Sequence, residues 1–407
     1  MSGLPTHRPV SPNAESFPVQ KMLMNDTMLD ATRLTRANRL IEATALIQRV
    51  LRGQTDQGDS TVFDRNFGAD TRPVSALENP LKFAWGLQNP TDAFQHYSTP
   101  GLKTWTRSER FTATDVVPAG GSFIEARYAN TAGSRAYKLY IPSGYKGQRL
   151  PLIIMLHGGT QTVDDFAGGT RMNVYAEDEN CLVAYPVQPP QANPCKCWNW
   201  FRPEDQCRGR GEPSLVAGIT QQIMKDYSVD RERVYVAGFS AGGAAAVVLA
   251  ATYPDLYAAI GVHSGLPYGA AEDVVSAFSA MRQGDPLKQF VGSETMGVRE
   301  ERMPAIVFHG DVDNIVHPRN SEGIASSVKQ SASCTDVHRD RVNNGREYTC
   351  TRHLDHNGRP VHECWTVHGA GHAWSGGHPA GSYTDPKGPD ATKQMLRFFR
   401  GHLLQSD

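Results

Sequence analysis

A serine between glycines is the first candidate for chemistry in this sequence. Gly238-Phe239-Ser240-Ala241-Gly242 follows a short apolar run at 234–237 and precedes an alanine-rich stretch at 241–252. A G-x-S-x-G motif between a strand and a helix places a nucleophilic serine on a tight, strained turn. The N-terminus of the following helix favours negative charge beside the serine. We therefore predict Ser240 to be a nucleophile; the alternative is an ordinary glycine-rich turn.

A second glycine-containing loop can stabilise the charge that such a serine creates. His157-Gly158-Gly159 directly follows the apolar run 152–156. In enzymes with the serine turn, one oxyanion donor lies in this loop and the other on the residue after the nucleophile. The expected donors are the backbone N–H groups of Gly159 and Ala241, unless the loop is only a turn.

A catalytic serine also needs a histidine base and a carboxylate that orients the base. Asp311 and Asp313 both follow the apolar run 305–308, and either can serve as the acid. Carboxylates at the carboxyl ends of parallel strands point into the crevice where ligands bind. His372 lies in a glycine-containing loop after the run 364–367 and is the expected base, whereas His368 is expected to make local contacts.

Aromatic and sulfur-containing side chains are the remaining candidates. Trp198, Trp200 and Trp374 lie in loops on the predicted active-site side and can line a substrate pocket or simply cover the loops. Cys195 and Cys197 form a C-x-C pair, which is not the usual zinc spacing. We therefore expect neither a metal nor a cofactor.

Two other cysteines flank a predicted hairpin. Asn357-Gly358 is a strong turn signal between Cys350 and Cys364. A three-residue loop at 356–358 makes the two cysteines face each other, close enough for a disulfide under oxidising conditions. A two-residue loop moves the register by one residue, so that Cys364 faces Thr351. We favour the three-residue loop.

The elements that position these residues alternate along the chain. Two paired strands are expected at 123–128 and 135–141. They are followed by strands at 152–156, 181–185, 234–237, 258–262, 305–308 and 364–367, and by helices at 164–179, 212–227, 241–252 and 392–403. Apolar strands alternating with helices predict an α/β fold with a mostly parallel sheet covered on both faces. The catalytic domain is predicted to span residues 119–404.

The N-terminal region reads differently. Residues 1–18 are rich in proline and small polar residues and are predicted to be a disordered tail. Residues 19–53 have an apolar stripe at helical spacing, which predicts an amphipathic helix that packs on the main domain, self-associates or docks on a polymer granule. Residues 54–118 are expected to be a linker region.

Composition excludes several classes of partner. The formal net charge of the 407 residues is -1, which gives no reason to expect binding to nucleic acid. No apolar run is long enough to predict a transmembrane helix. The first residues contain no apolar signal region, which favours a cytoplasmic location.

The motifs together resemble the esterases related to polyhydroxybutyrate depolymerases, a group that includes feruloyl and acetyl-xylan esterases. The resemblance rests on LHGGTQ at 156–161, CWNWF at 197–201, GFSAGG at 238–243, HSGLPYGAA at 263–271, FHGDVDNIVHP at 308–318 and GAGHAWSGG at 369–377. It implies an α/β-hydrolase fold, with Asp313 as the acid and His372 as the base. Many relatives have cysteine at the position of Gly159, a change that keeps the backbone N–H. Relatives with secretion signals act outside the cell, so the resemblance also allows an extracellular location.

The expected activity is hydrolysis of a carboxylic ester through an acyl-Ser240 intermediate. The expected substrate is a poly- or oligo(3-hydroxyalkanoate) such as polyhydroxybutyrate. The alternatives are a feruloyl or acetyl-xylan type of esterase, a serine peptidase, and a granule-bound protein without catalysis. Because no repeated blade pattern occurs, a peptidase with a propeller domain is disfavoured.

Overall fold

The computed structural model describes residues 116–284, 303–329 and 333–404. The predicted tail at 1–18, the helix at 19–53 and the linker up to residue 115 lie outside these residues, and those predictions stay untested.

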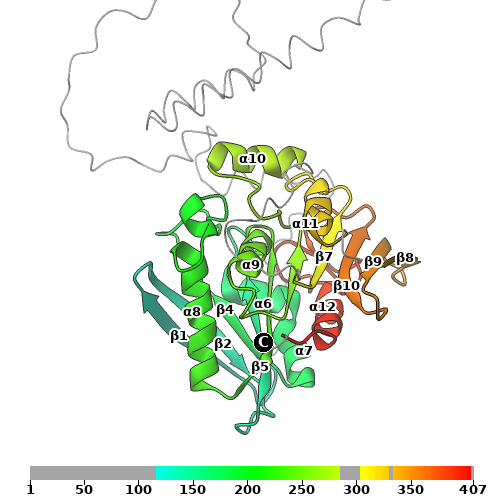
Figure 1. Cartoon of the computed structure of the whole chain (residues 1–407). Helices are drawn as coiled ribbons and strands as arrows, with labels where there is room; N and C mark the ends of the chain where they lie inside the picture. Colours follow the sequence, from blue (N-terminus) through cyan, green and yellow to red (C-terminus); the bar gives the residue numbers. More distant parts are fainter. Residues whose placement is uncertain (1–115, 285–302, 330–332, 405–407) are drawn as a thin grey trace, which may run out of the picture. The chain divides into compact units, whose positions relative to one another are not determined.

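A ten-stranded sheet runs through the described domain (Figure 1). Its strands are β1 (Ser122–Asn130), β2 (Gly133–Ile141), β3 (Leu150–Leu156), β4 (Leu182–Pro186), β5 (Val229–Phe239), β6 (Ala259–His263), β7 (Ala305–Gly310), β8 (Cys334–Arg341), β9 (Glu347–Leu354) and β10 (Pro360–Val367). The order across the sheet is β1-β2-β4-β3-β5-β6-β7-β10-β9-β8. The strands from β4 to β10 in that order are parallel, and antiparallel pairs extend the sheet at both edges.

Helices cover both faces of the sheet because its central strands are apolar on both faces. Leu152, Ile154 and Leu156 of β3 join one buried core, and Ile153 and Met155 join the other. The helices are α6 (Val163–Thr170), α7 (Met172–Glu179), α8 (Gly211–Asp226), α9 (Ala241–Thr252), α10 (Val274–Gln283), α11 (Arg319–Lys329) and α12 (Ala391–Arg400), with a short 3-10 turn η1 (Pro203–Gln206). Residues of α8 and α9 belong to the first core, and residues of α6, α7 and α12 to the second. The predicted α/β architecture is confirmed.

The single helix predicted at 164–179 is wrong. The chain forms two helices, α6 and α7, which are separated by Arg171 in a left-handed conformation with φ of 57°. Gly168 and Gly169 lie just before the break, and glycine is a poor helix former. The sequence analysis also missed α10, α11 and β8.

The predicted hairpin forms, but Cys350 and Cys364 do not face each other. Asp355 and Arg359 close the three-residue loop with a 2.9 Å backbone hydrogen bond, as expected, and Gly358 has φ of 75°. The register then shifts between Pro360 and His362, which is a β-bulge. In consequence Cys364 faces Thr351 and Cys350 faces Trp365. Neither cysteine forms a disulfide. The prediction that the two face each other is wrong, because one extra residue turns their side chains to opposite faces of the sheet.

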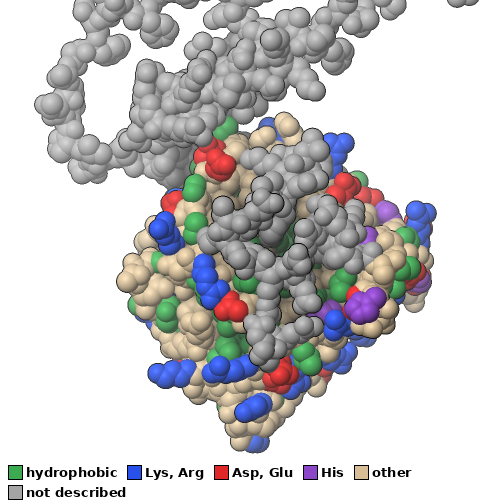
Figure 2. All heavy atoms as spheres, in the orientation of Figure 1, with side chains coloured by type: hydrophobic (Ala, Val, Ile, Leu, Met, Phe, Trp, Pro, Cys, Tyr) green, Lys and Arg blue, Asp and Glu red, His purple; other side chains and the backbone are tan. Residues whose placement is uncertain are grey.

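Side chains of both charges lie on the face of the molecule that Figure 2 shows. Lys and Arg side chains are interspersed with Asp and Glu side chains over the described part of the face in Figure 2. None of the helices in the described ranges is both long and apolar enough to cross a membrane.

Candidate active site

Ser240 lies on the sharp turn between β5 and α9. Its backbone has φ of 55° and ψ of -119°, a region that non-glycine residues rarely adopt. Neighbouring glycines permit the turn: a Cβ on Gly238 would lie 2.2 Å from the carbonyl oxygen of Gly242. A strained backbone at such a place is typical of functional sites. The Ser240 N–H donates to the His263 carbonyl at 2.9 Å, which ties the turn to β6.

The structure brings His372 and Asp313 together in a buried pair. His372 Nδ1 lies 2.7 Å from Asp313 Oδ2, and the two side chains are 5% and 0% exposed. Asp313 Oδ1 accepts hydrogen bonds from the backbone N–H groups of Ile315 and Val316, both at 2.9 Å. Because a carboxylate only accepts, His372 donates from Nδ1 and its Nε2 is left as the acceptor that a general base needs.

The electrostatics of this pair favour an ionised carboxylate. Burial alone raises the pKa of Asp313. The charge of His372 and the hydrogen bonds from His309 and His372 outweigh that effect, so the net pKa lies well below its ordinary range. His309 Nε2 lies 3.4 Å from Asp313 Oδ2 and 2.8 Å from the Val316 carbonyl. Asp313 is therefore a negative charge fixed beside His372.

The alternative acid, Asp311, belongs to a different pair. Asp311 Oδ2 lies 2.8 Å from His368 Nδ1, and these side chains are 36% and 39% exposed. His368 Nε2 lies 2.8 Å from the Thr349 hydroxyl. The local contacts predicted for His368 are therefore present. Because β7 and β10 are adjacent and parallel, the loops that follow them meet at one edge of the sheet. The loop after β7 supplies the aspartate of each pair, and the loop after β10 supplies the histidine.

His372 lies beside the serine turn. The ring of Phe239, the residue before Ser240, is 4.8 Å from the His372 ring between centroids. The oxyanion loop approaches the same turn from β3, since a Cβ on Gly242 would lie 2.1 Å from the carbonyl oxygen of Leu156. Among the described residues, no hydrogen-bond acceptor contacts the N–H groups of Gly159 or Ala241. Two unpaired donors of this kind are what an oxyanion requires.

The structure buries Trp198, Trp200 and Trp374, and their contacts with substrate stay a prediction. The three residues are 0%, 6% and 2% exposed. Trp198 Nε1 donates to the His157 carbonyl, and Trp374 Nε1 donates to the Thr392 hydroxyl, both at 3.1 Å. The bonded indoles of Trp198 and Trp374 hold their loops in place, as the alternative reading of the sequence expects.

His263 is a residue of the site that the sequence analysis missed. In addition to its carbonyl bond to Ser240, its ring Nε2 accepts the Ser375 N–H at 2.9 Å, three residues after His372. The ring stacks on Trp374 at 5.1 Å. Burial lowers the pKa of His263 well below its ordinary value, so the ring stays neutral. The motif HSGLPYGAA marked this segment, but only tertiary contacts show that His263 joins the serine turn to the His372 loop.

The arrangement is suited to acyl transfer to and from a serine. It contains a strained serine, an oriented histidine, a buried carboxylate and two free N–H groups. In the part of the chain that the structure describes, no three His, Cys, Asp or Glu side chains are placed to bind a metal ion.

Comparison with known proteins agrees with this chemistry. A family model described as "Esterase PHB depolymerase" matches residues 135–349. Poly(3-hydroxyalkanoate) depolymerase C of Paucimonas lemoignei is 29% identical over 278 residues, which are 65% of this chain and 66% of that protein. Feruloyl esterase B of Thermothelomyces thermophilus is 31% identical over 187 residues, which are 42% of this chain and 62% of that protein. The chain thus spans just under two thirds of the length of these relatives.

A solved structure shows the same fold. The acetyl xylan esterase from Aspergillus awamori superimposes with a TM-score of 0.53 at 20% sequence identity, over 68% of this chain and 99% of that chain. The described domain thus has the α/β-hydrolase fold.

Proposed function

The chain belongs to the esterase PHB depolymerase family, and we propose that it hydrolyses carboxylic esters through a covalent intermediate on Ser240. The observation that carries the proposal is the buried His372–Asp313 pair beside the strained Ser240 turn. Fold alone does not decide function, whereas the chemistry of a site does.

In the proposed first half-reaction, Ser240 Oγ attacks the ester carbonyl carbon while His372 Nε2 takes the hydroxyl proton. The carbonyl oxygen becomes an oxyanion, which accepts hydrogen bonds from the N–H groups of Gly159 and Ala241. The tetrahedral intermediate collapses, the bond to the alcohol oxygen breaks, and His372 gives its proton to the leaving alkoxide. The product of this half is an acyl-Ser240 ester.

In the second half, water attacks the acyl carbon and gives a proton to His372. The second tetrahedral intermediate collapses to release the carboxylic acid, and the proton returns to Ser240. Throughout, Asp313 keeps the proton of the neutral ring on Nδ1 and stabilises the imidazolium. Because all these groups are amino-acid side chains or backbone amides, the proposed steps call on no cofactor.

For the substrate we propose a poly- or oligo(3-hydroxyalkanoate). This rests on the family and on the relative named poly(3-hydroxyalkanoate) depolymerase C. Feruloyl and acetyl-xylan esters are the alternative substrates, because relatives carry those names. Docking on a polymer granule through residues 19–53 stays a prediction. The relatives do not support the cytoplasmic location predicted from the sequence, so cell fractionation has to decide between that location and an extracellular one.

The test compares the wild-type chain with Ser240→Ala on three substrate classes: p-nitrophenyl acyl esters, hydroxybutyrate oligomers and feruloyl esters. We expect the wild type to hydrolyse hydroxybutyrate oligomers with the highest kcat/KM. We expect Ser240→Ala to lose several orders of magnitude in kcat, because a triad nucleophile is removed. Near-wild-type turnover of Ser240→Ala would contradict the assignment, and an inactive wild type would support the non-catalytic alternative.

A further inference from the structure

His157 makes a hydrogen bond with each of its ring nitrogens in the loop after β3. The residue is 1% exposed. Its Nδ1 lies 2.8 Å from the Gly158 carbonyl oxygen, and its Nε2 lies 3.1 Å from the backbone nitrogen of Gln188. A carbonyl cannot donate and a backbone N–H cannot accept, so the proton is on Nδ1 and the lone pair on Nε2. Burial lowers the pKa of His157 to about 4, which keeps the ring in this neutral form at ordinary pH.

The carbonyl that His157 binds belongs to the same peptide unit as the Gly159 N–H. The peptide is trans, since the described chain contains no cis peptide bond. In a trans peptide the C=O and the N–H point in opposite directions. A carbonyl fixed toward His157 therefore aims the Gly159 N–H away from that ring. The Gly158 N–H is also fixed, by a 2.9 Å hydrogen bond to Gln161 Oε1.

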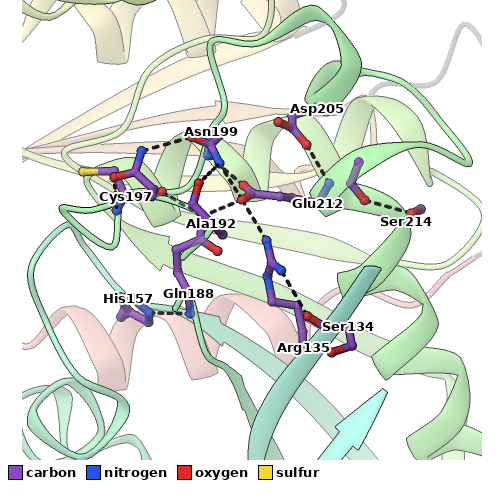
Figure 3. A network of polar contacts seen from close by, with 12 residues as sticks. Ser134, Arg135, His157, Gln188, Ala192, Cys197, Asn199, Asp205, Glu212 and Ser214 are labelled. Carbon is purple, nitrogen blue, oxygen red and sulfur yellow. Dashed lines mark hydrogen bonds and ion pairs between the residues drawn. The ribbon is translucent and has the colours of Figure 1, made fainter. Parts of the chain in front are cut away.

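His157 is held by two hydrogen bonds from the segment 188–198. The backbone N–H of Gln188 binds the ring, and the indole N–H of Trp198 binds the His157 carbonyl at 3.1 Å. The Gln188 side chain also donates to the Cys197 carbonyl at 2.8 Å, which joins the two ends of this segment (Figure 3).

The segment is in turn tied to a buried carboxylate, Glu212, near the start of α8 (Figure 3). Glu212 Oε2 accepts the Asn199 backbone N–H at 2.7 Å, and Oε1 accepts the Asn199 side-chain amide at 2.8 Å. Oε1 also accepts the side-chain amide of Gln188 and lies 3.1 Å from Arg135 Nη2. A buried carboxylate with this many partners is rigid. A continuous chain of hydrogen bonds therefore links Glu212 through Gln188 and His157 to the Gly158–Gly159 peptide.

We propose that His157 is a positioning residue of the oxyanion site: its Nδ1–H fixes the Gly158–Gly159 peptide so that the Gly159 N–H faces the reacting carbonyl. The Glu212 network fixes the ring in that role. This inference rests on the proposed ester hydrolysis, in which His157 touches neither the substrate nor a reacting atom. It therefore acts only through the Gly159 N–H.

The test uses three substitutions that separate the two ring nitrogens. In His157→Asn the amide nitrogen can occupy the place of Nδ1 and restore the donor. In His157→Gln the amide lies further out, near the place of Nε2. His157→Phe keeps a ring and removes both nitrogens. We expect His157→Phe and His157→Gln to lower kcat by about 10- to 100-fold, which is no more than the fall in kcat when a whole oxyanion donor is removed. Asn should retain kcat within about fivefold of the wild type, because it restores the bond that matters.

A transition-state analogue distinguishes positioning from general damage. A trifluoromethyl ketone adds to the serine and forms an oxyanion, so its Ki should rise for Phe and Gln by about the same factor as kcat/KM falls. KM for the p-nitrophenyl ester should change less than about threefold, because the ground-state ester does not carry the oxyanion charge. Asp205→Asn is the matched control. Asp205 Oδ1 accepts the Glu212 N–H at 2.7 Å, but the side chain is not part of the route to His157. We expect Asp205→Asn to keep kcat.

Each result decides a separate question. An active wild type with unchanged kcat and Ki in the Phe and Gln variants would overturn the positioning role alone. So would equal losses in the Asn and Gln variants, and this comparison still decides if the Phe variant does not fold. A wild type that hydrolyses no ester would overturn the proposed function and this inference with it.

Discussion

Replacing Asp313 by asparagine removes one charge from the site with almost no change of shape. In the wild type Oδ1 accepts two backbone N–H groups at 2.9 Å, and Oδ2 accepts the His372 Nδ1–H at 2.7 Å. The asparagine oxygen can keep the two backbone bonds, which places its NH₂ group against His372. An NH₂ group cannot accept, so His372 has to move its proton to Nε2 and can no longer take the proton of Ser240.

The size of the effect follows from that tautomer change. Holding the wrong tautomer and losing the carboxylate charge together lower kcat by about 10³- to 10⁴-fold in a Ser-His-Asp site, or about 4–5.5 kcal/mol in activation free energy. Asp311→Asn is the matched control, because Asp311 lies two residues from Asp313 in the same loop but pairs with the partly exposed His368. Exposed pairs contribute little, so we expect a change of less than about threefold.

The assay is kcat on a saturating soluble ester near neutral pH, with the melting temperature of each variant as a check on folding. Similar small losses in both variants would refute the reasoning that Asp313 fixes the tautomer. A larger loss in Asp311→Asn would show that the acid had been assigned to the wrong aspartate.

Three further predictions concern other parts of the molecule. A Cβ on Gly159 would lie 2.5 Å from Cys197 Sγ, so Gly159→Cys should form a disulfide with Cys197 after a small shift. Unreduced protein should then show two alkylatable thiols fewer than reduced protein, and an unchanged thiol count would contradict the prediction. Burial and the charge of Glu212 raise the pKa of Asp205 to about 6. A carboxyl group with a raised pKa contributes stability below about pH 4, and that contribution is lost as the pH rises to about 6. Over that range the free energy of unfolding, measured in urea, should therefore fall by up to about 3 kcal/mol more for the wild type than for Asp205→Asn. Equal losses in the two proteins would contradict the prediction. A chain that begins near Thr104 should keep kcat on small soluble esters, because every motif of the site lies beyond residue 150, and a folded but inactive shortened chain would show that earlier residues help to build the site.

The sequence was most informative where a short segment determines its own structure. The serine turn at Ser240 and the left-handed Gly358 follow from local steric rules that glycine motifs reveal. The alternating apolar runs likewise predict the parallel sheet, because such strands have to be buried on both faces.

It was least informative where contacts between distant segments decide the outcome. The sequence analysis did not predict the bulge after Pro360, which moves Cys364 out of register with Cys350. The roles of His263 and His157 depend on the segments to which they bind, and a histidine next to glycine gives no indication of its partners. For the tryptophans, position in a loop did not predict exposure, because the loops themselves fold onto the core.

The way in which β7 and β10 pair has a consequence for how this kind of protein can diversify. The two strands are neighbours in the sheet although α11, β8 and β9 lie between them in the chain. After the Asp313 loop and α11, the chain adds β8 and β9 to the edge of the sheet and returns through β10 to the position beside β7. The spacing of Asp313 and His372 is fixed by the hydrogen bonds between β7 and β10 and not by the length of that excursion. Insertions and deletions should be tolerated between α11 and β8, where a loop of another length could be grafted while β9 stays paired with β10 and the chemistry stays unaltered.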